Sequence, residues 1–379
     1  MSHFRKIVVI LIFGFGYATS FGQVLIPMDY EEQADHLKAY GLVFEAVDKG
    51  YECHWLLNHR GGSFVILDAD QFIIQKALLK GVSYENYGAS ALISLMSELK
   101  SPSTNTNTVE LERVPKIAVY SPAGKQPWDD AVTLVLTYAE IPFETIYDDE
   151  VLGGKLSQYD WLHLHHEDFT GQYGKFYGAY RDAAWYINQK SQFEAHAKSL
   201  GFNKVSKAKG AVAEVISEYV NQGGFLFAMC SATDSYDIAL ASRNTDICES
   251  MFDGDPSSPG AALAMDYDRC FAFENFDLVM NPLRYEYSSI DITDQRVRRV
   301  KEEQDYFELF DFSAKYDVVP TILVQNHTAL VKGFYGQTTA YDIKTLKPST
   351  TVLGKSKTDA AARYIHGTYG EGYWTFYGG

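Results

Sequence analysis

The stretch that decides the fold prediction is Gly223-Gly224-Phe225-Leu226-Phe227-Ala228-Met229-Cys230-Ser231-Ala232-Thr233-Asp234. Its two glycines end a helix that the apolar spacing predicts over residues 211–220. The apolar run after them is typical of a strand that is buried on both faces. Small residues then open another helix, so we expect a sharp strand-to-helix turn at Cys230.

The turn at Cys230 has the chemistry of a nucleophile site. A residue at its tip is held above the sheet, and the N–H groups at the start of the next helix point at whatever binds there. The same helix end favours a thiolate, so we expect Cys230 to be a nucleophile. A buried structural cysteine is the alternative, because free cysteines are often buried. The ligand-binding positions predicted beside Cys230 are Ser231, Ala232, Thr233 and Asp234.

Strands and helices alternate along the chain in two blocks. The first, 23–100, is a smaller N-terminal α/β segment, and the polar stretch 101–114 is typical of a linker. The second, 115–379, repeats the alternation and carries an irregular insertion at about 246–315. Such alternation indicates right-handed crossovers and a doubly wound, mostly parallel sheet. The strands expected in the second block are at 116–120, 143–147, 159–165 and 224–229, with an aromatic strand at the chain end.

In parallel sheets, ligands bind beyond the carboxyl ends of the strands. This rule adds Ser121 and Lys125, which follow the predicted strand at 116–120, to the ligand-binding positions. It also points to residues 165–168 and to the Cys230 turn.

A second polar constellation, His163-Leu164-His165-His166-Glu167-Asp168, closes the predicted strand at 159–165. Alternation puts His163 and His165 on one face of that strand and His166 on the other. If this strand neighbours the one before Cys230, His165 or His166 can serve as a general base to the thiol, with Glu167 as the nearby carboxylate. His163 and His165 are also candidate metal ligands, although no third ligand follows from the sequence. Hydrogen-bonded histidines at a sheet edge are the alternative.

The stretch Gly223 to Asp234 resembles the corresponding segment of the ThuA-like (trehalose utilisation) proteins, members of the class I glutamine amidotransferase-like superfamily. The terminal run Tyr369-Gly370-Glu371-Gly372-Tyr373-Trp374-Thr375-Phe376-Tyr377-Gly378-Gly379 resembles that family's late glycine-rich strand. The resemblance covers about 115–379. It implies a flavodoxin-like, class I glutamine amidotransferase-like core with its nucleophile at Cys230. ThuA-like proteins usually have histidine there, whereas amidotransferases have cysteine.

A complete amidotransferase triad also needs a histidine and an acid after the last core strand. The family tends to place that histidine after the terminal glycines, where this chain ends at Gly379, and His366 precedes the last turn. Residues 117–174 and the C-terminal run also resemble exported bacterial proteins that are often labelled asparagine synthetase B. The residues do not support that label, because the chain has no Ser-Gly-Gly-x-Asp-Ser loop and carries Ser2 after Met1.

The first 22 residues have the pattern of a cleavable secretory signal. Arg5 and Lys6 precede an apolar run at 7–16 that is too short to span a bilayer, and small residues follow at the expected cleavage site after Gly22. Removing the two basic residues changes the formal net charge from −16 to −18. Such an acidic chain is a poor partner for nucleic acid or anionic membranes. We expect a periplasmic or secreted protein with a small-molecule or carbohydrate ligand, no membrane span and no cofactor.

Four cysteines are present, and outside the cytosol Cys248 and Cys270 would close a short loop if they paired. Residues 253–255 and 266–268 offer oxygen ligands for calcium, but their spacing does not fit an EF-hand loop, and a solvated acidic loop is the simpler interpretation. The 27 tyrosines and 23 phenylalanines suit either a carbohydrate-stacking cleft or an ordinary large core.

These features predict an exported cysteine-dependent hydrolase or amidotransferase-like enzyme that acts on a small polar substrate. The alternative is a non-catalytic sugar- or peptide-binding protein of the ThuA-like kind, with its ligand in the same cleft. The two differ in whether Cys230 reacts.

Overall fold

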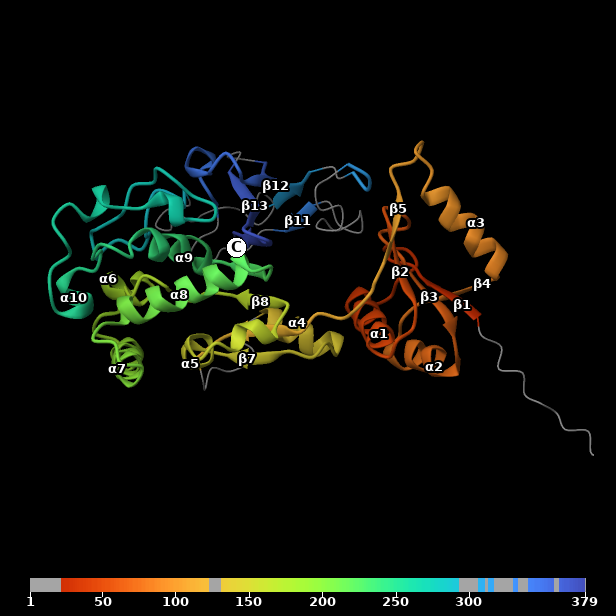
Figure 1. Ribbon diagram of the computed structural model, residues 1–379, viewed down its shortest axis with the longest axis horizontal. Helices are drawn as coiled ribbons and strands as arrows, with labels where there is room; N and C mark the ends of the chain where they lie inside the picture. Colours follow the sequence, from red (N-terminus) through yellow and green to blue (C-terminus); the bar gives the residue numbers. More distant parts are fainter. Residues whose placement is uncertain are drawn as a thin grey trace, which may run out of the picture.

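The computed structural model describes residues 22–122, 131–292, 306–310, 313–316, 330–332, 340–357 and 361–378. They form two sheets, one in the N-terminal part of the chain and one in the remainder (Figure 1). The predicted secretory signal lies outside the described residues except for Gly22, which begins the first strand. Within the described ranges, no helix combines the length and the apolar character that a membrane crossing requires.

The first sheet has five strands in the order β4-β1-β3-β2-β5, and every neighbouring pair is antiparallel. Alternate residues of β1 serve two cores. Val24 and Ile26 pack under α1 and α2, whereas Leu25 packs under α3 on the other face. The elements are β1 (Gly22–Ile26), α1 (His36–Asp48), β2 (Cys53–Leu57), β3 (Phe64–Ala69), α2 (Gln71–Lys80), β4 (Glu85–Tyr87), α3 (Ala89–Leu99) and β5 (Asn107–Glu110).

The order of this sheet is the split βαβ arrangement of ferredoxin-like folds, with β5 added beside β2. Helix α1 joins β1 and β2, which run in the same direction, but β3 lies between them and is antiparallel to both. A pattern of alternating strands and helices cannot show such an inserted strand. β5 comes from 107–110, so this part of the predicted linker belongs to the first sheet.

The second sheet has nine strands in the order β11-β10-β12-β13-β14-β9-β8-β6-β7. Its pairs are parallel from β7 to β14 and antiparallel from β14 to β11. The strands are β6 (Ile117–Tyr120), β7 (Glu144–Ile146), β8 (Trp161–Leu164), β9 (Phe225–Met229), β10 (Tyr306–Leu309), β11 (Leu330–Lys332), β12 (Thr351–Ser356), β13 (Ala362–Tyr369) and β14 (Gly372–Tyr377).

The prediction of a doubly wound, mostly parallel sheet, flavodoxin-like and class I glutamine amidotransferase-like, is therefore wrong. Of the twelve strand pairs within the described ranges, eight are antiparallel. The reason lies in the connections, because antiparallel strands can be joined by two-residue turns, whereas parallel neighbours need a crossover. Only two residues separate β13 from β14, and Gly370 supplies the left-handed conformation (φ 59°) at that turn.

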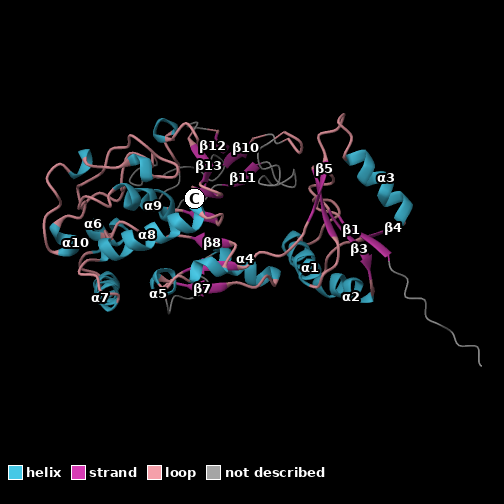
Figure 2. Cartoon of the chain, viewed as in Figure 1, coloured by secondary structure: helices cyan, strands magenta, loops and turns pink. Residues whose placement is uncertain are grey.

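Helices α8 and α9 cover one face of the second sheet (Figure 2). Leu162 and Leu164 of β8 and Leu226 and Ala228 of β9 point into this core. Ile117 and Val119 of β6 point the other way and pack with Leu136 of α4. The helices are α4 (Ala131–Ala139), α5 (Asp148–Leu152), α6 (Tyr177–Tyr180), α7 (Ala184–Ser199), α8 (Val205–Asn221), α9 (Ser231–Ala241) and α10 (Ser250–Asp253), with short 3₁₀ turns at Lys155–Gln158, Tyr173–Lys175, Ala261–Leu263, Tyr267–Arg269 and Ile343–Thr345.

The two parts of the chain meet where α1 packs against α4. Lys38 Nζ lies 2.7 Å from Glu140 Oε1, and Tyr138 donates its hydroxyl hydrogen bond to Asp35. Gly41 faces the end of α4 so closely that a Cβ atom there would lie 1.7 Å from the carbonyl oxygen of Ala139. The helices can approach this closely only because residue 41 has no side chain.

We expect Gly41→Ala to destabilise the protein by about 1–3 kcal/mol, as an overpacked methyl group does. In an open helix the same change would stabilise by about 1 kcal/mol, so the sign reports the contact with α4. Urea unfolding measures it. Gly88→Ala is the control for an uncrowded glycine, because a Cβ atom at Gly88 meets nothing within 4 Å. Gly88 is the N-cap of α3, where alanine caps less well than glycine, so we expect a loss of only roughly 0.5 kcal/mol there. A Gly41→Ala protein at least as stable as the wild type would contradict the close packing of α1 on α4.

Candidate functional site

Cys230 occupies a strained turn between β9 and α9. Its backbone angles are φ 51° and ψ −136°, and it is the N-cap residue of α9. The Cys230 N–H donates to the carbonyl oxygen of Tyr377 at 3.1 Å, and the Cys230 carbonyl accepts from Thr233 N at 3.2 Å and Thr233 Oγ1 at 2.7 Å. A non-glycine residue in such a region costs about 1–3 kcal/mol and persists only where its surroundings enforce it. The predicted turn is confirmed.

Cys230 borders a cavity of about 180 Å³. The ends of β8 and β9 supply part of its wall, because these strands are parallel neighbours and their carboxyl ends meet at one edge. Ser231 Oγ donates to the carbonyl oxygen of His166 at 2.9 Å and so ties the two strand ends together. The residues lining the cavity are His166, Glu167, Asp168, Tyr173, Gly174, Phe176, Gln189, Phe193, Cys230, Ser231 and Tyr285.

A left-handed segment forms another wall of the cavity. Tyr173, Gly174 and Lys175 all have positive φ, at 52°, 70° and 57°. Asp168 holds this loop, since its carboxylate accepts from Thr170 N at 2.7 Å, Thr170 Oγ1 at 2.6 Å and Gly174 N at 2.9 Å. Burial raises the pKa of Asp168, although the hydrogen bonds from Thr170 and Gly174 lower it. The loop is therefore fixed in a conformation that most sequences avoid.

Lys175 anchors the far end of this segment. Its buried ammonium donates to the carbonyl oxygens of Val279 at 2.7 Å and Asn281 at 3.3 Å. Burial lowers the pKa of Lys175 to about 8, although Asp168 and Glu286 oppose the shift.

A buried charge network lies behind the cavity. Lys209 Nζ donates to Tyr120 Oη at 2.7 Å, Tyr147 Oη at 2.9 Å and Asp148 Oδ1 at 2.9 Å. Burial alone would lower the pKa of Lys209, but Tyr147, Asp148 and Glu167 raise it. Glu167, which lines the cavity, thus interacts electrostatically with Lys209 of this network.

Several predicted site residues lie away from the cavity wall. The ring of His165 lies 4.7 Å from that of His166, centroid to centroid, and His163 is buried on β8 and stacks on Phe227. Ser121 directly follows β6 and donates its N–H to the carbonyl oxygen of Ile146. Ala232, Thr233 and Asp234 are buried in the first turn of α9, where the Thr233 N–H is already bonded to Cys230. Lys125 lies outside the described residues.

His366 is not next to Cys230. It is buried on β13, with Nδ1 3.2 Å from Thr375 Oγ1, and burial lowers its pKa. The register places Thr375 beside Phe227, three residues before the turn. Among the described cavity-lining residues the imidazole comes from His166.

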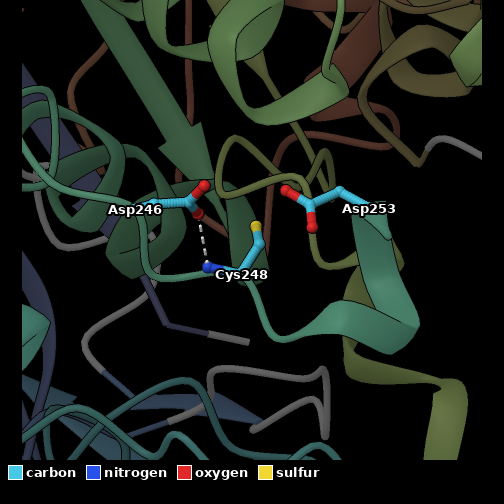
Figure 3. A group of neighbouring side chains, drawn as sticks. All are labelled: Asp246, Cys248 and Asp253. Carbon is cyan, nitrogen blue, oxygen red and sulfur yellow. Dashed lines mark hydrogen bonds between the residues drawn. The ribbon is translucent and has the colours of Figure 1, made fainter. Parts of the chain in front are cut away.

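The four cysteines are free and buried, so Cys248 and Cys270 are not paired. Cys248 donates its S–H to Thr170 O at 3.4 Å and Cys270 to Asp237 O at 3.3 Å. Burial raises the pKa of both thiols. Within the described ranges, Asp246, Cys248 and Asp253 are the group of side chains whose spacing suits a metal ion (Figure 3). Neither His163 nor His165 belongs to it.

The sequence prediction missed the aromatic half of the cavity wall. Tyr173 lies in the left-handed segment and Phe176 directly after it, Phe193 lies in α7, and Tyr285 lies in the predicted insertion. The local signal was Phe169-Thr170-Gly171-Gln172-Tyr173-Gly174-Lys175-Phe176, a glycine- and aromatic-rich run directly after the strand that carries the histidines.

No protein-family model matches this chain, and no curated protein matches it. Similar solved structures include the cytoplasmic proteins STM3548 and STM1381 from Salmonella typhimurium, at 11% and 10% identity and TM-scores of 0.32 and 0.34, each comparison covering 69% of this chain and 86% of the other. Another is a beta-galactosidase from Bacillus circulans sp. alkalophilus, at 11% identity and a TM-score of 0.28, over 69% of this chain and 28% of the galactosidase. TM-scores this low do not establish a shared fold.

We expect Lys175 to make stability depend on pH. Its pKa of about 8 in the folded protein is below the ordinary value of 10.5, so between these two pH values the unfolded chain binds the proton that the folded chain has lost. The contribution of this group to the free energy of unfolding therefore rises with pH across that interval, by about 3 kcal/mol in total. Urea unfolding of wild type and Lys175→Met at pH 7.5–10.5 measures the difference. Lys198→Met, at an exposed site, should keep the wild-type profile, and an unchanged profile in Lys175→Met would refute this origin.

Proposed function

We propose that this protein is a cysteine-dependent hydrolase or amidotransferase-like enzyme that acts on a small polar substrate in the cavity beside Cys230. The observation that carries the proposal is the coincidence of two strained backbone segments at one cavity. Cys230 and the segment at 173–175 both have positive φ, and both border the space that His166 and Glu167 line. Strain of this kind clusters at active sites.

The arrangement supports acyl transfer to sulfur. Cys230 Sγ attacks the carbonyl carbon of an amide or ester, and the backbone N–H of Ser231, the cavity-lining residue at the start of α9, donates to the oxyanion. His166 takes the thiol proton and gives it to the leaving group as the C–N or C–O bond breaks. Water then cleaves the thioester, which yields the acid and restores the thiol.

The charge of the residues that line the cavity restricts the class of substrate that it can bind. Glu167 and Asp168 line it, and the described lining residues include no lysine or arginine side chain. Gln189 Oε1 is buried without a hydrogen-bond partner in the described part of the chain, so it offers an acceptor. An uncharged or positively charged substrate with hydrogen-bond donors fits this wall better than an anion. The secretory pattern of residues 1–22 supports action outside the cytoplasm.

We expect Cys230 to react first with iodoacetamide below pH 8. Burial raises the pKa of Cys53 to about 12 and raises the pKa of Cys248 and Cys270 as well, so those thiols are internal controls. Peptide mass spectrometry measures the four rates. Equal, slow labelling of all four would argue against a nucleophile at the turn.

Turnover tests the same residue directly. A panel of aryl esters and primary amides identifies a substrate, and Cys230→Ser should then lose on the order of 10³-fold or more in kcat. Cys270→Ser should retain full turnover. Unchanged turnover in Cys230→Ser would eliminate the mechanism.

Non-catalytic sugar binding is the second candidate, and an aromatic rim favours it. Tyr180 and Trp185 are 46% and 47% exposed, with ring centroids 5.1 Å apart. Phe176 of the cavity wall lies 5.7 Å from Trp185 and 5.8 Å from Tyr285. The half-exposed rings of Tyr180 and Trp185 therefore lie next to Phe176 of the cavity wall, where a pyranose ring can stack on them.

We expect Trp185→Ala to weaken the binding of any oligosaccharide that the wild type binds by roughly 10-fold, about 1.4 kcal/mol. Calorimetry with glucose, xylose and N-acetylglucosamine oligomers measures the change. Tyr30→Ala, at an exposed aromatic ring in the first part of the chain, is the matched control. Binding that is equal in both variants would exclude the rim from the ligand site.

A further inference from the structure

A thiol and two carboxylates converge outside the Cys230 cavity. Asp246 and Cys248 lie in the loop after α9, and Asp253 ends the short helix α10 (Ser250–Asp253). One candidate ligand atom from each lies within 4.8 Å of the other two. Figure 3 shows the Asp253 carboxylate directed toward the Cys248 sulfur and the Asp246 carboxylate on its other side.

The charges around this cluster do not balance. Lys204 Nζ lies 2.6 Å from Asp246 Oδ2 and 3.0 Å from Asp253 Oδ2, and it also contacts Asp255. Three carboxylates thus share one ammonium group. The Asp253 side chain is only 5% exposed, so water screens this excess of negative charge poorly.

Some ligand positions remain open after these contacts. Asp253 Oδ1 is buried and has no hydrogen-bond partner in the described part of the chain. Lys204 engages the Oδ2 atoms of Asp246 and Asp253, so an ion can use Asp253 Oδ1 without displacing the lysine. Asp246 Oδ1 accepts from the Cys248 N–H at 2.9 Å, which fixes that carboxylate beside the thiol.

We propose that Asp246, Cys248 and Asp253 form a binding site for a divalent transition-metal cation of the Zn²⁺ type, with Lys204 holding the outer carboxylate oxygens. A thiolate among the ligands selects such an ion over Ca²⁺ or Mg²⁺. Zn–S distances of about 2.3 Å and Zn–O distances of about 2.0–2.2 Å require side-chain movements of roughly 1 Å. The Cys248 S–H bond gives its proton to solvent as the metal–sulfur bond forms.

The proposed metal site lies next to the turn at Thr170, which supports the wall of the Cys230 cavity. Cys248 Sγ now bonds to the carbonyl oxygen of Thr170, whose N–H and hydroxyl hold Asp168 at the cavity. An ion at Cys248 would fasten the loop after α9 to α10 beside this turn. Its role is structural, and it does not depend on the chemistry of Cys230.

Cobalt is the probe for this site. The full chain, stripped with EDTA, is titrated with Co²⁺, and a thiolate-to-cobalt absorption band should appear and saturate at one ion per chain. Zn²⁺ should abolish the band by competition and raise the melting temperature. Cys248→Ser should lose the band, and Asp253→Asn should weaken Zn²⁺ binding on the order of 10–100-fold.

Two variants are matched controls. Cys270→Ser removes a thiol that is equally buried and also bonded to a carbonyl oxygen, and Cys230→Ser removes the one at the turn. Both should keep the band. The proposal is overturned if wild type gives no band, if Cys248→Ser keeps it, or if a folded Asp253→Asn protein binds Zn²⁺ as tightly as wild type does.

Discussion

The parallel pairing of β8 with β9 is the constraint on which the candidate site depends. It brings the histidine-rich end of one strand to the Cys230 turn of the other, although more than 60 residues separate them in the sequence. β14 pairs with the other side of β9, and the carbonyl oxygen of its last residue, Tyr377, accepts a hydrogen bond from the Cys230 N–H. The turn is therefore held from both sides, and this support offsets the conformational cost of a cysteine with positive φ.

Two buried ionisable side chains in the part of the chain that builds the second sheet, Lys209 and Asp237, each have several hydrogen-bond partners. Lys209 meets a carboxylate and two phenolic hydroxyls, and the Asp237 carboxylate accepts from the N–H groups of Phe271, Ala272 and Phe273 at 2.8–3.0 Å. Burial of a charge is tolerated only with such partners. The charge of Lys209 acts on Glu167 at the cavity, and Asp237 fixes residues 271–273 within the predicted insertion.

Sequence reasoning placed most local elements and missed their assembly. The strand and turn at 225–230 follow from a short apolar run bounded by glycines and small residues, and both are confirmed. The relative direction of neighbouring strands could not be predicted from this pattern. In the first sheet β3 inserts between β1 and β2, and in the second sheet the sequence pattern did not indicate the strands β12 and β13. Glu167 and His166 were predictable from their place at a strand end. Tyr285 was not, because contacts between distant segments leave no periodicity in the chain.

The length of the strands has a consequence for how copies of this protein behave in concentrated solution. Among the residues that the structure describes, the outer strands of the two sheets are β4, β5, β7 and β11, and each has only three or four residues. The long strands β13 and β14, with eight and six residues, have neighbours on both sides. Unpaired backbone at a sheet edge is a template for β-aggregation, and short edges offer little of it. Strand-to-strand association between chains is thus discouraged by the order in which each sheet is built.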